Sequence, residues 1–271
     1  MESGLDPAID RFDDPLPLSG NPLSAGNFST IYKVSPDLAI KIIRCETTRS
    51  LRECEHEANV LQKLKQLPTE QSNSNSQPCV RITNLDSVFA PFPARKQVFQ
   101  IFLDYGGDSL KNIITCRNKT AYWKTLLDFE GSHFIQILEQ MIEGLTWVHR
   151  CNIAHRQINA DHLLLKREPS GKLVQLKIAD FGASVTLPCD EDFYSDVRAI
   201  STMIYFMIYG RDVDSHLSPK NLVRLPEVLP SEIEAFSQWI LSKRPTIQVC
   251  QDLIEKFAKS DSFTEKLNYH N

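Results

Sequence analysis

The sequence predicts an α+β fold, with a strand-rich first part and a mainly helical second part. Alternating and β-branched residues over 23–43 indicate short antiparallel strands. Two further strand patterns, over 80–88 and 98–105, end at the Gly106-Gly107 pair. Beyond that pair, apolar residues recur mostly at helical spacing, which is typical of packed helices.

The first part has a clear signal for each element. A Gly/Asn/Ser turn and the Ser35-Pro36-Asp37 turn divide residues 23–43 into three strands. Residues 51–67 place Ala58, Leu61 and Leu64 at helical spacing. We therefore expect five antiparallel strands and one helix before the double glycine.

The second part carries its strongest helical pattern over residues 134–149. The apolar face of that segment is formed by Ile135, Leu138, Met141, Leu145 and Val148. Short strands are expected at 163–166 and 174–178, and later helices at 197–209 and 247–257.

Composition excludes several classes of protein. The 271 residues suffice for one bilobal domain with a sizeable core, and the formal net charge of −4 argues against binding to nucleic acid. No run approaches the length of a membrane span, and the acidic first residues lack the pattern of a secretory signal. Seven scattered cysteines predict reduced thiols, so we expect a cytoplasmic or nuclear protein that is not secreted.

Short motifs follow one another in a characteristic order. They are Leu38-Ala39-Ile40-Lys41, Glu57 on the predicted helix, His155-Arg156-Gln157, Asp180-Phe181-Gly182, Asp196 and Arg244-Pro245-Thr246. The set resembles the V-A-I-K, E-x-x-x-L, H-R-D, D-F-G and R-P-T motifs of eukaryotic-type protein kinases. In that family, the residue at Asp196 starts the long helix of the second lobe.

The resemblance covers about residues 23–257 and implies a bilobal, protein-kinase-like fold. Prolines among acidic and small residues predict a flexible lead-in over residues 1–20. The resemblance assigns residues 21–105 to the N-lobe and 106–271 to a C-lobe with a shortened activation segment. The N-lobe would hold the five strands and one helix, and the C-lobe the remaining helices.

The resemblance also implies an ATP pocket with its walls retained. Lys41 would contact the α and β phosphates and pair with Glu57, and Asp180 would hold one Mg²⁺. Ile31, Ala39 and Leu164 match the residues that usually sandwich adenine. Leu103 would lie at the back of the pocket, and Asp104 and Tyr105 would form the hinge. Only Gly26 remains of the glycines in the phosphate-covering loop, which weakens the phosphate cradle without abolishing it. An apolar stack between the lobes would join Leu61, His155 and Phe181.

The catalytic loop departs from the family at three positions. Gln157 replaces the Asp that takes the substrate hydroxyl proton, and an amide has no basic oxygen near neutral pH. Asn159 replaces the Lys that stabilises the γ-phosphate. His162 replaces the Asn that gives an oxygen to a second Mg²⁺, a hard cation for which imidazole is a poor ligand. We expect His162 to be a partly exposed polar residue.

The segment between Asp180 and Asp196 is short, and no A-P-E motif follows it. The resemblance therefore implies that the platform for a peptide substrate is missing. Arg244, which in the family pairs with the Glu of A-P-E, is expected to find a substitute carboxylate or solvent. Arg156 would have little phosphate to receive, because Thr186 is the only Thr in this segment.

These features predict a pseudokinase, a non-catalytic signalling regulator or scaffold with weak or metal-independent ATP binding. Family analogy suggests a protein partner such as a related active kinase, and the segments 71–77 and 111–124 are candidate contact surfaces. The alternative is an active but atypical serine/threonine kinase that transfers the γ-phosphate and uses Asp161 as a displaced carboxylate. A third interpretation, transfer of AMP, is permitted by the retained Lys41, Glu57 and Asp180.

Overall fold

The computed structural model describes eight stretches of the chain. They are residues 22–25, 29–45, 47–66, 85–89, 98–115, 132–167, 173–209 and 231–258. Gly26 and residues 71–77 lie outside the described residues, as do residues 80–84 of one predicted strand and residues 116–124 of one candidate contact segment.

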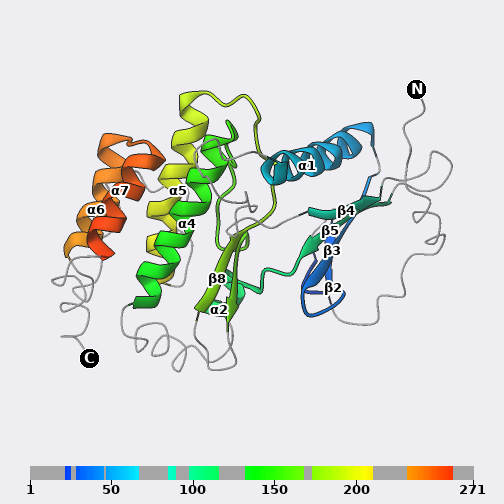
Figure 1. Cartoon of the computed structure of the whole chain (residues 1–271), viewed down its shortest axis with the longest axis horizontal. Helices are drawn as coiled ribbons and strands as arrows, with labels where there is room; N and C mark the ends of the chain where they lie inside the picture. Colours follow the sequence, from blue (N-terminus) through cyan, green and yellow to red (C-terminus); the bar gives the residue numbers. More distant parts are fainter. Residues whose placement is uncertain are drawn as a thin grey trace.

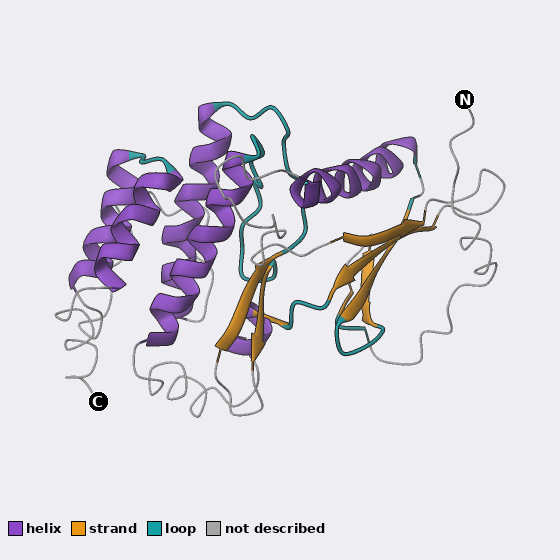
Figure 2. Ribbon diagram, viewed as in Figure 1, coloured by secondary structure: helices purple, strands orange, loops and turns teal. Residues whose placement is uncertain are grey.

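The first part of the chain forms one antiparallel sheet covered by a helix (Figures 1 and 2). Its strands are β1 (Ser24–Ala25), β2 (Ser29–Lys33), β3 (Leu38–Arg44), β4 (Leu85–Phe89) and β5 (Val98–Asp104), in the order β1-β2-β3-β5-β4. The helix α1 (Thr48–Gln66) lies along one face of this sheet. The predicted five strands and one helix are confirmed.

Strand β3 is central because its sequence suits a strand paired on both edges. Its alternating and β-branched residues favour an extended backbone, and most of its side chains are buried. In register, Lys41 lies opposite Ile31 on β2 and Ile101 on β5. The predicted Ser35-Pro36-Asp37 turn closes the β2–β3 connection through a hydrogen bond from the Val34 N–H to the Leu38 carbonyl, 2.9 Å long.

The second part is mainly helical and contains a small sheet. The sheet joins β6 (Asp108–Ser109), β7 (Leu163–Arg167) and β8 (Leu173–Ile178). The helices are α2 (Leu110–Thr115), α4 (Ser132–Arg150), α5 (Asp190–Tyr209), α6 (Ser231–Lys243) and α7 (Ile247–Ala258). In Figure 1 the small sheet lies between the helices α4–α7 and the first sheet. The predicted strands at 163–166 and 174–178 and the predicted helix at 134–149 are confirmed.

Two helical expectations need correction. Helix α5 begins at Asp190, although Asp196 was expected to start it. The earlier start has a local cause, because Asp192 accepts a hydrogen bond from the Cys189 N–H at 3.0 Å and so caps the first turn. Helix α6 was not predicted, yet Ile233, Phe236 and Ile240 are all buried and are spaced as on one helical face.

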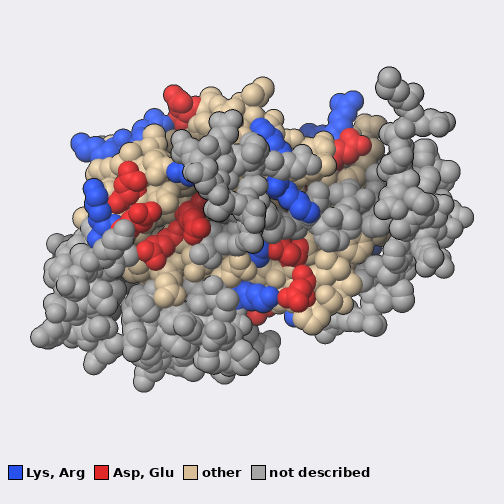
Figure 3. Space-filling view, in the orientation of Figure 1, with Lys and Arg blue, Asp and Glu red and all other residues tan. Residues whose placement is uncertain are grey.

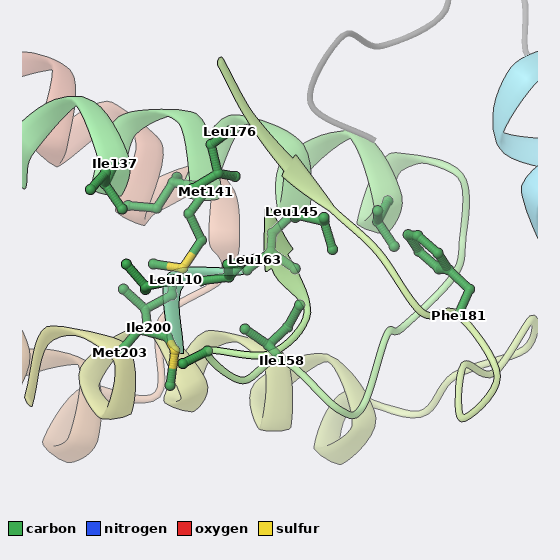
Figure 4. Packing of buried hydrophobic residues seen from close by; sticks show 14 of the residues in the cluster. Leu110, Ile137, Met141, Leu145, Ile158, Leu163, Leu176, Phe181, Ile200 and Met203 are labelled. Atoms are coloured by element: carbon green, nitrogen blue, oxygen red, sulfur yellow. The ribbon is translucent and has the colours of Figure 1, made fainter. Parts of the chain in front are cut away.

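The core of the second part is built around α4. All five residues of its predicted apolar face are buried: Ile135, Leu138, Met141, Leu145 and Val148. Figure 4 shows Met141 and Leu145 packed with Leu163 and Leu176 of the small sheet. Phe181 lies at one end of the same cluster, so the segment after β8 is anchored to the core.

The connection between the two sheets requires its two glycines. A Cβ on Gly106 would lie 2.9 Å from Leu164 Cδ1, and one on Gly107 would lie 2.1 Å from the Leu165 carbonyl oxygen. Gly107 also has a φ of +101°, which disfavours side chains. The pair therefore lets the chain pass close beside β7 as it leaves β5. The division into lobes at residue 105 stays a prediction.

Two expectations from composition can be compared with the described residues. No helix among them is long and apolar enough to cross a membrane. Their five cysteines, Cys45, Cys54, Cys151, Cys189 and Cys250, are free thiols.

Candidate functional site

Lys41 on β3 lies at the centre of a buried charge network. Its Nζ is 2.9 Å from Glu57 Oε1, 2.8 Å from Glu57 Oε2 and 3.0 Å from Asp180 Oδ1. An ammonium group has three N–H donors, so these three contacts use all of them. Burial alone would lower the pKa of Lys41, but the two carboxylates outweigh it and raise the pKa. Lys41 is therefore a permanent cation, and the predicted Lys41–Glu57 pair is present.

Asp180 brings the two halves of the molecule together at this network. It follows β8, and its φ of +66° is a left-handed conformation that Asp tolerates better than most residues. Oδ1 accepts from Lys41, and Oδ2 lies 3.3 Å from His162 Nε2. Burial would raise the pKa of Asp180, but Lys41, His162 and the Gly182 N–H lower it to about 2. Asp180 is thus ionised at neutral pH.

His162 is held in one orientation by the loop that precedes it. Its Nδ1 lies 2.8 Å from the Gln157 carbonyl oxygen, and its Nε2 faces Asp180. The side chain is 15 % exposed, in line with the expected partly exposed polar residue. The pairing with Asp180 was not predicted, and no sequence pattern indicated it, because only the fold brings these two residues together.

Asn159, another replaced residue, and the nearby Asp161 both make contacts within the protein. Asn159 Oδ1 accepts from the backbone N–H of Asp161 at 2.8 Å and of His162 at 3.2 Å, which forms a side-chain-capped turn. The carboxylate of Asp161 lies 2.7 Å from Lys111 Nζ on α2. Asn159 therefore stabilises the turn that presents His162, while Asp161 is committed to an ion pair.

A buried carboxylate anchors the start of this loop. Asp196 on α5 accepts from the backbone N–H of His155 at 2.7 Å and of Arg156 at 2.6 Å. His149 Nε2 lies 3.0 Å from the same carboxylate. Because Arg156 has a φ of +65°, these bonds hold the backbone in a conformation it would otherwise disfavour.

The apolar stack expected between the lobes has its members buried. Leu61, His155 and Phe181 are 3 %, 0 % and 0 % exposed. The rings of His155 and Phe181 lie 4.7 Å apart, and His155 Nε2 lies 3.0 Å from the Ala179 carbonyl oxygen. Burial lowers the pKa of His155, which favours the neutral ring. The stack therefore packs around an uncharged imidazole.

The short segment after Gly182 is tied down at both ends. Ser184 donates its hydroxyl to the Phe181 carbonyl at 2.6 Å, and its own carbonyl lies 2.8 Å from His56 Nε2 on α1. Val185 forms a two-way backbone bridge with Ala154. Cys189, seven residues after Gly182, directly precedes α5, and its backbone N–H donates to Asp192 in the first turn of that helix. No sequence signal pointed to the His56–Ser184 contact.

The first turn of α5 supplies carboxylates to two arginines. Arg244 pairs with Glu191, which confirms the expected substitute carboxylate, and stacks over the Tyr194 ring at 4.2 Å. Arg156, which was expected to have little phosphate to receive, has its Nε 3.3 Å from Asp192 Oδ1, and the expectation about phosphate stays a prediction. The acidic run Asp190-Glu191-Asp192 was the sequence signal for both pairs, since acids favour a helix N-terminus.

The residues predicted to line an adenine pocket fall on neighbouring strands. Ala39 lies opposite Leu103 in the β3–β5 register, and both are buried. Ile31 on β2 and Leu164 on β7 are partly buried. Figure 1 shows β2 on one side of the connection between the two sheets and the small sheet, to which β7 belongs, on the other side. Apolar residues on both sides suit a flat ring, although their role toward a nucleotide stays a prediction.

The hinge residues have contacts that the sequence did not indicate. Asp104 pairs with the buried Lys177 of β8, and Lys33 Nζ lies 4.0 Å from the centre of the Tyr105 ring. The Asp104–Lys177 pair links the end of β5 to the strand that leads into Asp180. It therefore ties the hinge to the charge network through β8.

The donor set does not fit a pair of Mg²⁺ ions. Mg²⁺ prefers oxygen ligands in near-octahedral geometry, and His162 offers nitrogen where an amide oxygen is needed. Within the described part of the chain, no three His, Cys, Asp or Glu side chains form a group that could hold a metal. Asp180 is the one carboxylate of this set that faces His162, and Lys41 already binds it.

Comparisons with known proteins agree with this architecture. Residues 19–207 match the family described as protein kinase domain. The chain is similar to Serine/threonine-protein kinase PLK4 of Drosophila sechellia and of Drosophila melanogaster, each 28% identical over 142 residues. The PLK4 of Drosophila willistoni is 26% identical over 151 residues. These alignments cover 42% to 46% of this chain but only 17% or 18% of the relatives, so the chain spans less than a fifth of their length.

Proposed function

We propose that this chain, which belongs to the protein kinase domain family, is a pseudokinase. In this proposal it acts as a non-catalytic signalling regulator or scaffold through contact with another protein. Phosphoryl transfer needs a base or orienting group for the hydroxyl, positive charge at the γ-phosphate and metal-holding oxygens. The chain has a substitution at each of these positions, namely Gln157, Asn159 and His162.

The observation that carries the proposal is the internal use of the catalytic loop. Asn159 caps the turn, and His162 is held between the Gln157 carbonyl and Asp180. A loop whose polar groups bind one another has fewer groups to offer a substrate. The loop is therefore organised for its own stability, and this favours a structural role over a catalytic one.

The retained framework supports a role in recognition. The Lys41–Glu57 pair, the Lys41–Asp180 pair and the buried stack of His155 and Phe181 hold α1 and the segment after β8 in fixed positions. A surface held in place loses little conformational freedom on binding, which favours affinity. On the face shown in Figure 3 the described acidic and basic side chains are interspersed, which suits a protein partner with mixed charge.

The test is transfer of labelled γ-phosphate from ATP to the protein itself and to generic protein substrates. We expect wild-type protein to give the same signal as Asp180→Asn, because neither has a working site. A signal that disappears in Asp180→Asn or Lys41→Met would overturn the proposal. ATP labelled on the α-phosphate, used in the same assay, tests the transfer of AMP.

The second candidate is an active but atypical serine/threonine kinase. It is favoured by the intact Lys41–Glu57 pair and by the similarity to proteins named as serine/threonine kinases. In this candidate Asp161 replaces the missing carboxylate, although its Oδ2 is 2.7 Å from Lys111 Nζ. This candidate predicts that transfer is measurable and is lost in Asp161→Asn, while Lys111→Met changes its rate.

A further inference from the structure

We infer that Cys45 and Cys54 are a site of reversible oxidation, at which a disulfide joins the end of β3 to α1 once the first turn of α1 opens. Their sulfur atoms lie 3.4 Å apart, and both residues are buried. An S–S bond is about 2.0 Å long, so the two atoms need to approach by roughly 1.4 Å. Cys45 Sγ also lies 3.9 Å from the Ile43 carbonyl oxygen, a weak contact that this movement can break. The inference goes beyond the proposed function and does not depend on whether the chain transfers phosphate.

The two cysteines lie at the same junction as the Lys41–Glu57 pair. Cys45 directly follows β3, and side chains alternate along a strand, so Cys45 is on the face of β3 that carries Lys41. Cys54 is three residues before Glu57 on α1, so these two share a face of the helix. Lys41 Nζ is 2.8 Å from Glu57 Oε2, which shows that the two faces meet. A disulfide would therefore add a covalent link beside the ion pair that holds α1 to β3.

Burial keeps the pair reduced while α1 is closed. Burial, the hydrogen bond with Cys45 and the charge of Glu57 raise the pKa of Cys54 to about 12. The thiolate is the reactive form of cysteine, so a neutral, buried thiol reacts slowly. The pair therefore needs access to solvent before an oxidant can act on it.

The start of α1 gives that access. Helix ends open more readily than helix centres. Thr47 is exposed and caps α1, because its Oγ1 accepts from the Ser50 N–H at 3.1 Å, while Ser50 Oγ accepts from the Thr47 N–H at 3.1 Å. Cys45 lies two residues before this cap. Opening of the first turn therefore uncovers Cys45 and leaves Cys54 close by.

The oxidant is a hydroperoxide. One sulfur attacks as the thiolate, and the O–O bond breaks to give a sulfenic acid and an alcohol, or water where the oxidant is hydrogen peroxide. The second sulfur then attacks the sulfenic sulfur, and the hydroxyl leaves as water with the proton of the second thiol. Each sulfur loses one electron, and the peroxide gains two. A small dithiol reverses the reaction by exchange and is itself oxidised to a disulfide.

The experiment treats the whole chain with hydrogen peroxide, blocks the remaining thiols with iodoacetamide and maps the peptides by mass spectrometry without reductant. Trypsin cleaves after Lys and Arg, so it releases Cys45 and Cys54 in separate peptides, residues 45–49 and 53–63. We expect these two peptides to be joined in the oxidised protein and to separate again after treatment with dithiothreitol.

Alanine variants identify the sulfurs involved. Cys45→Ala and Cys54→Ala should each abolish the link. The matched control is Cys250→Ala, because Cys250 is also buried and burial raises its pKa to about 12, but it lies on α7. This variant should form the link as wild type does. If one of the first two variants does not fold, the linked peptides of wild-type protein still decide the result.

The rate of linkage tests the opening of α1. Thr47→Ala removes the cap, so the first turn opens more often and the link should form about fivefold faster. The control is Thr48→Ala, the same chemical change at the next residue, which is the first residue of α1. Its rate should stay close to that of wild type.

Three results would overturn the inference. They are the absence of the linked peptides after peroxide treatment, a link that forms only in urea, and equal rates of linkage in Thr47→Ala and Thr48→Ala. Phosphate transfer by wild-type protein would instead contradict the proposed function and leave this inference standing.

Discussion

Asp196 illustrates how one buried carboxylate sets the shape of the catalytic loop. It is 1 % exposed and accepts from two successive backbone N–H groups, those of His155 and Arg156. Hydrogen bonds to an ionised group contribute more than neutral ones, and their loss leaves buried donors without partners. The loop that carries Gln157, Asn159 and His162 therefore depends on a residue outside it.

Replacing Asp196 should be costly. We expect Asp196→Ala to lower the free energy of unfolding by about 3 kcal/mol. Urea denaturation followed by circular dichroism measures this loss. The control is Glu191→Ala, an exposed ion-pair carboxylate on the same helix, whose loss should cost less than about 1 kcal/mol. Equal losses in the two variants would contradict the anchoring role of Asp196.

Asp180 makes stability depend on pH. Its pKa is lowered from the usual 3.8 to about 2, so the native state holds its proton less tightly than the unfolded state does. The stabilisation is fully present above about pH 4 and is lost as the pH falls through about 2. We expect Asp180→Asn to lose less stability than wild type over this interval. Urea midpoints at a series of acidic pH values check this, and parallel curves for the two proteins would contradict it.

At the scale of elements, the first turn of helix α5 contacts two other parts of the chain. Its first turn caps the helix through Asp192 and Cys189, pairs Asp192 with Arg156 and pairs Glu191 with Arg244. The helix thereby connects the catalytic loop, through Arg156, to the residues between α6 and α7, through Arg244. The acids of this turn therefore give both Arg156 and Arg244 a carboxylate partner.

The α5 turn can be tested by a pair of matched substitutions. We expect Asp192→Ala to lower the thermal midpoint more than Asp190→Ala, because only Asp192 both accepts from the Cys189 N–H and pairs with Arg156. Both acids lie in the first turn, so the general effect of the helix dipole is shared. A differential scanning fluorimetry series measures the two midpoints. Indistinguishable midpoints would show that the cap and the pair contribute nothing.

Elements were more predictable from the sequence than contacts were. The apolar face of α4 was visible because helical periodicity repeats over many residues, and all of that face is buried. The start of α5 was misplaced because a cap depends on local hydrogen bonds, here from Cys189 to Asp192. The Lys41–Glu57 pair followed from family motifs. The contacts of His162 with Asp180 and of His56 with Ser184 join residues far apart in the chain, and no periodicity encodes them.

At the scale of the whole molecule, α1 is fastened to the helical part by several independent contacts. His56 binds the Ser184 carbonyl at 2.8 Å, and the Trp147 Nε1–H donates to the Leu64 carbonyl at 3.4 Å. The Lys41–Asp180 pair spans the same junction. The two parts are thus joined around the charge network by side chains from both of them.

Loosening one of these contacts should free α1 without unfolding the chain. We expect His56→Ala to speed hydrogen exchange of the α1 amides and to leave the amides of α4 unchanged. The control is Arg49→Ala, which removes an exposed i,i+4 pair with Glu53 on the same helix. Hydrogen exchange with mass spectrometry resolves the two helices. Equal α1 exchange in both variants would show that the His56–Ser184 contact does not fasten α1.

The central claim is that the framework is intact while the replaced loop residues prevent transfer. The most direct measurement compares γ-phosphate transfer by wild-type protein, by Asp180→Asn and by a variant that combines Gln157→Asp, Asn159→Lys and His162→Asn. The account predicts that wild type and Asp180→Asn give the same background signal, and that the combined variant alone rises above it. Transfer by wild-type protein above the Asp180→Asn background would contradict the account.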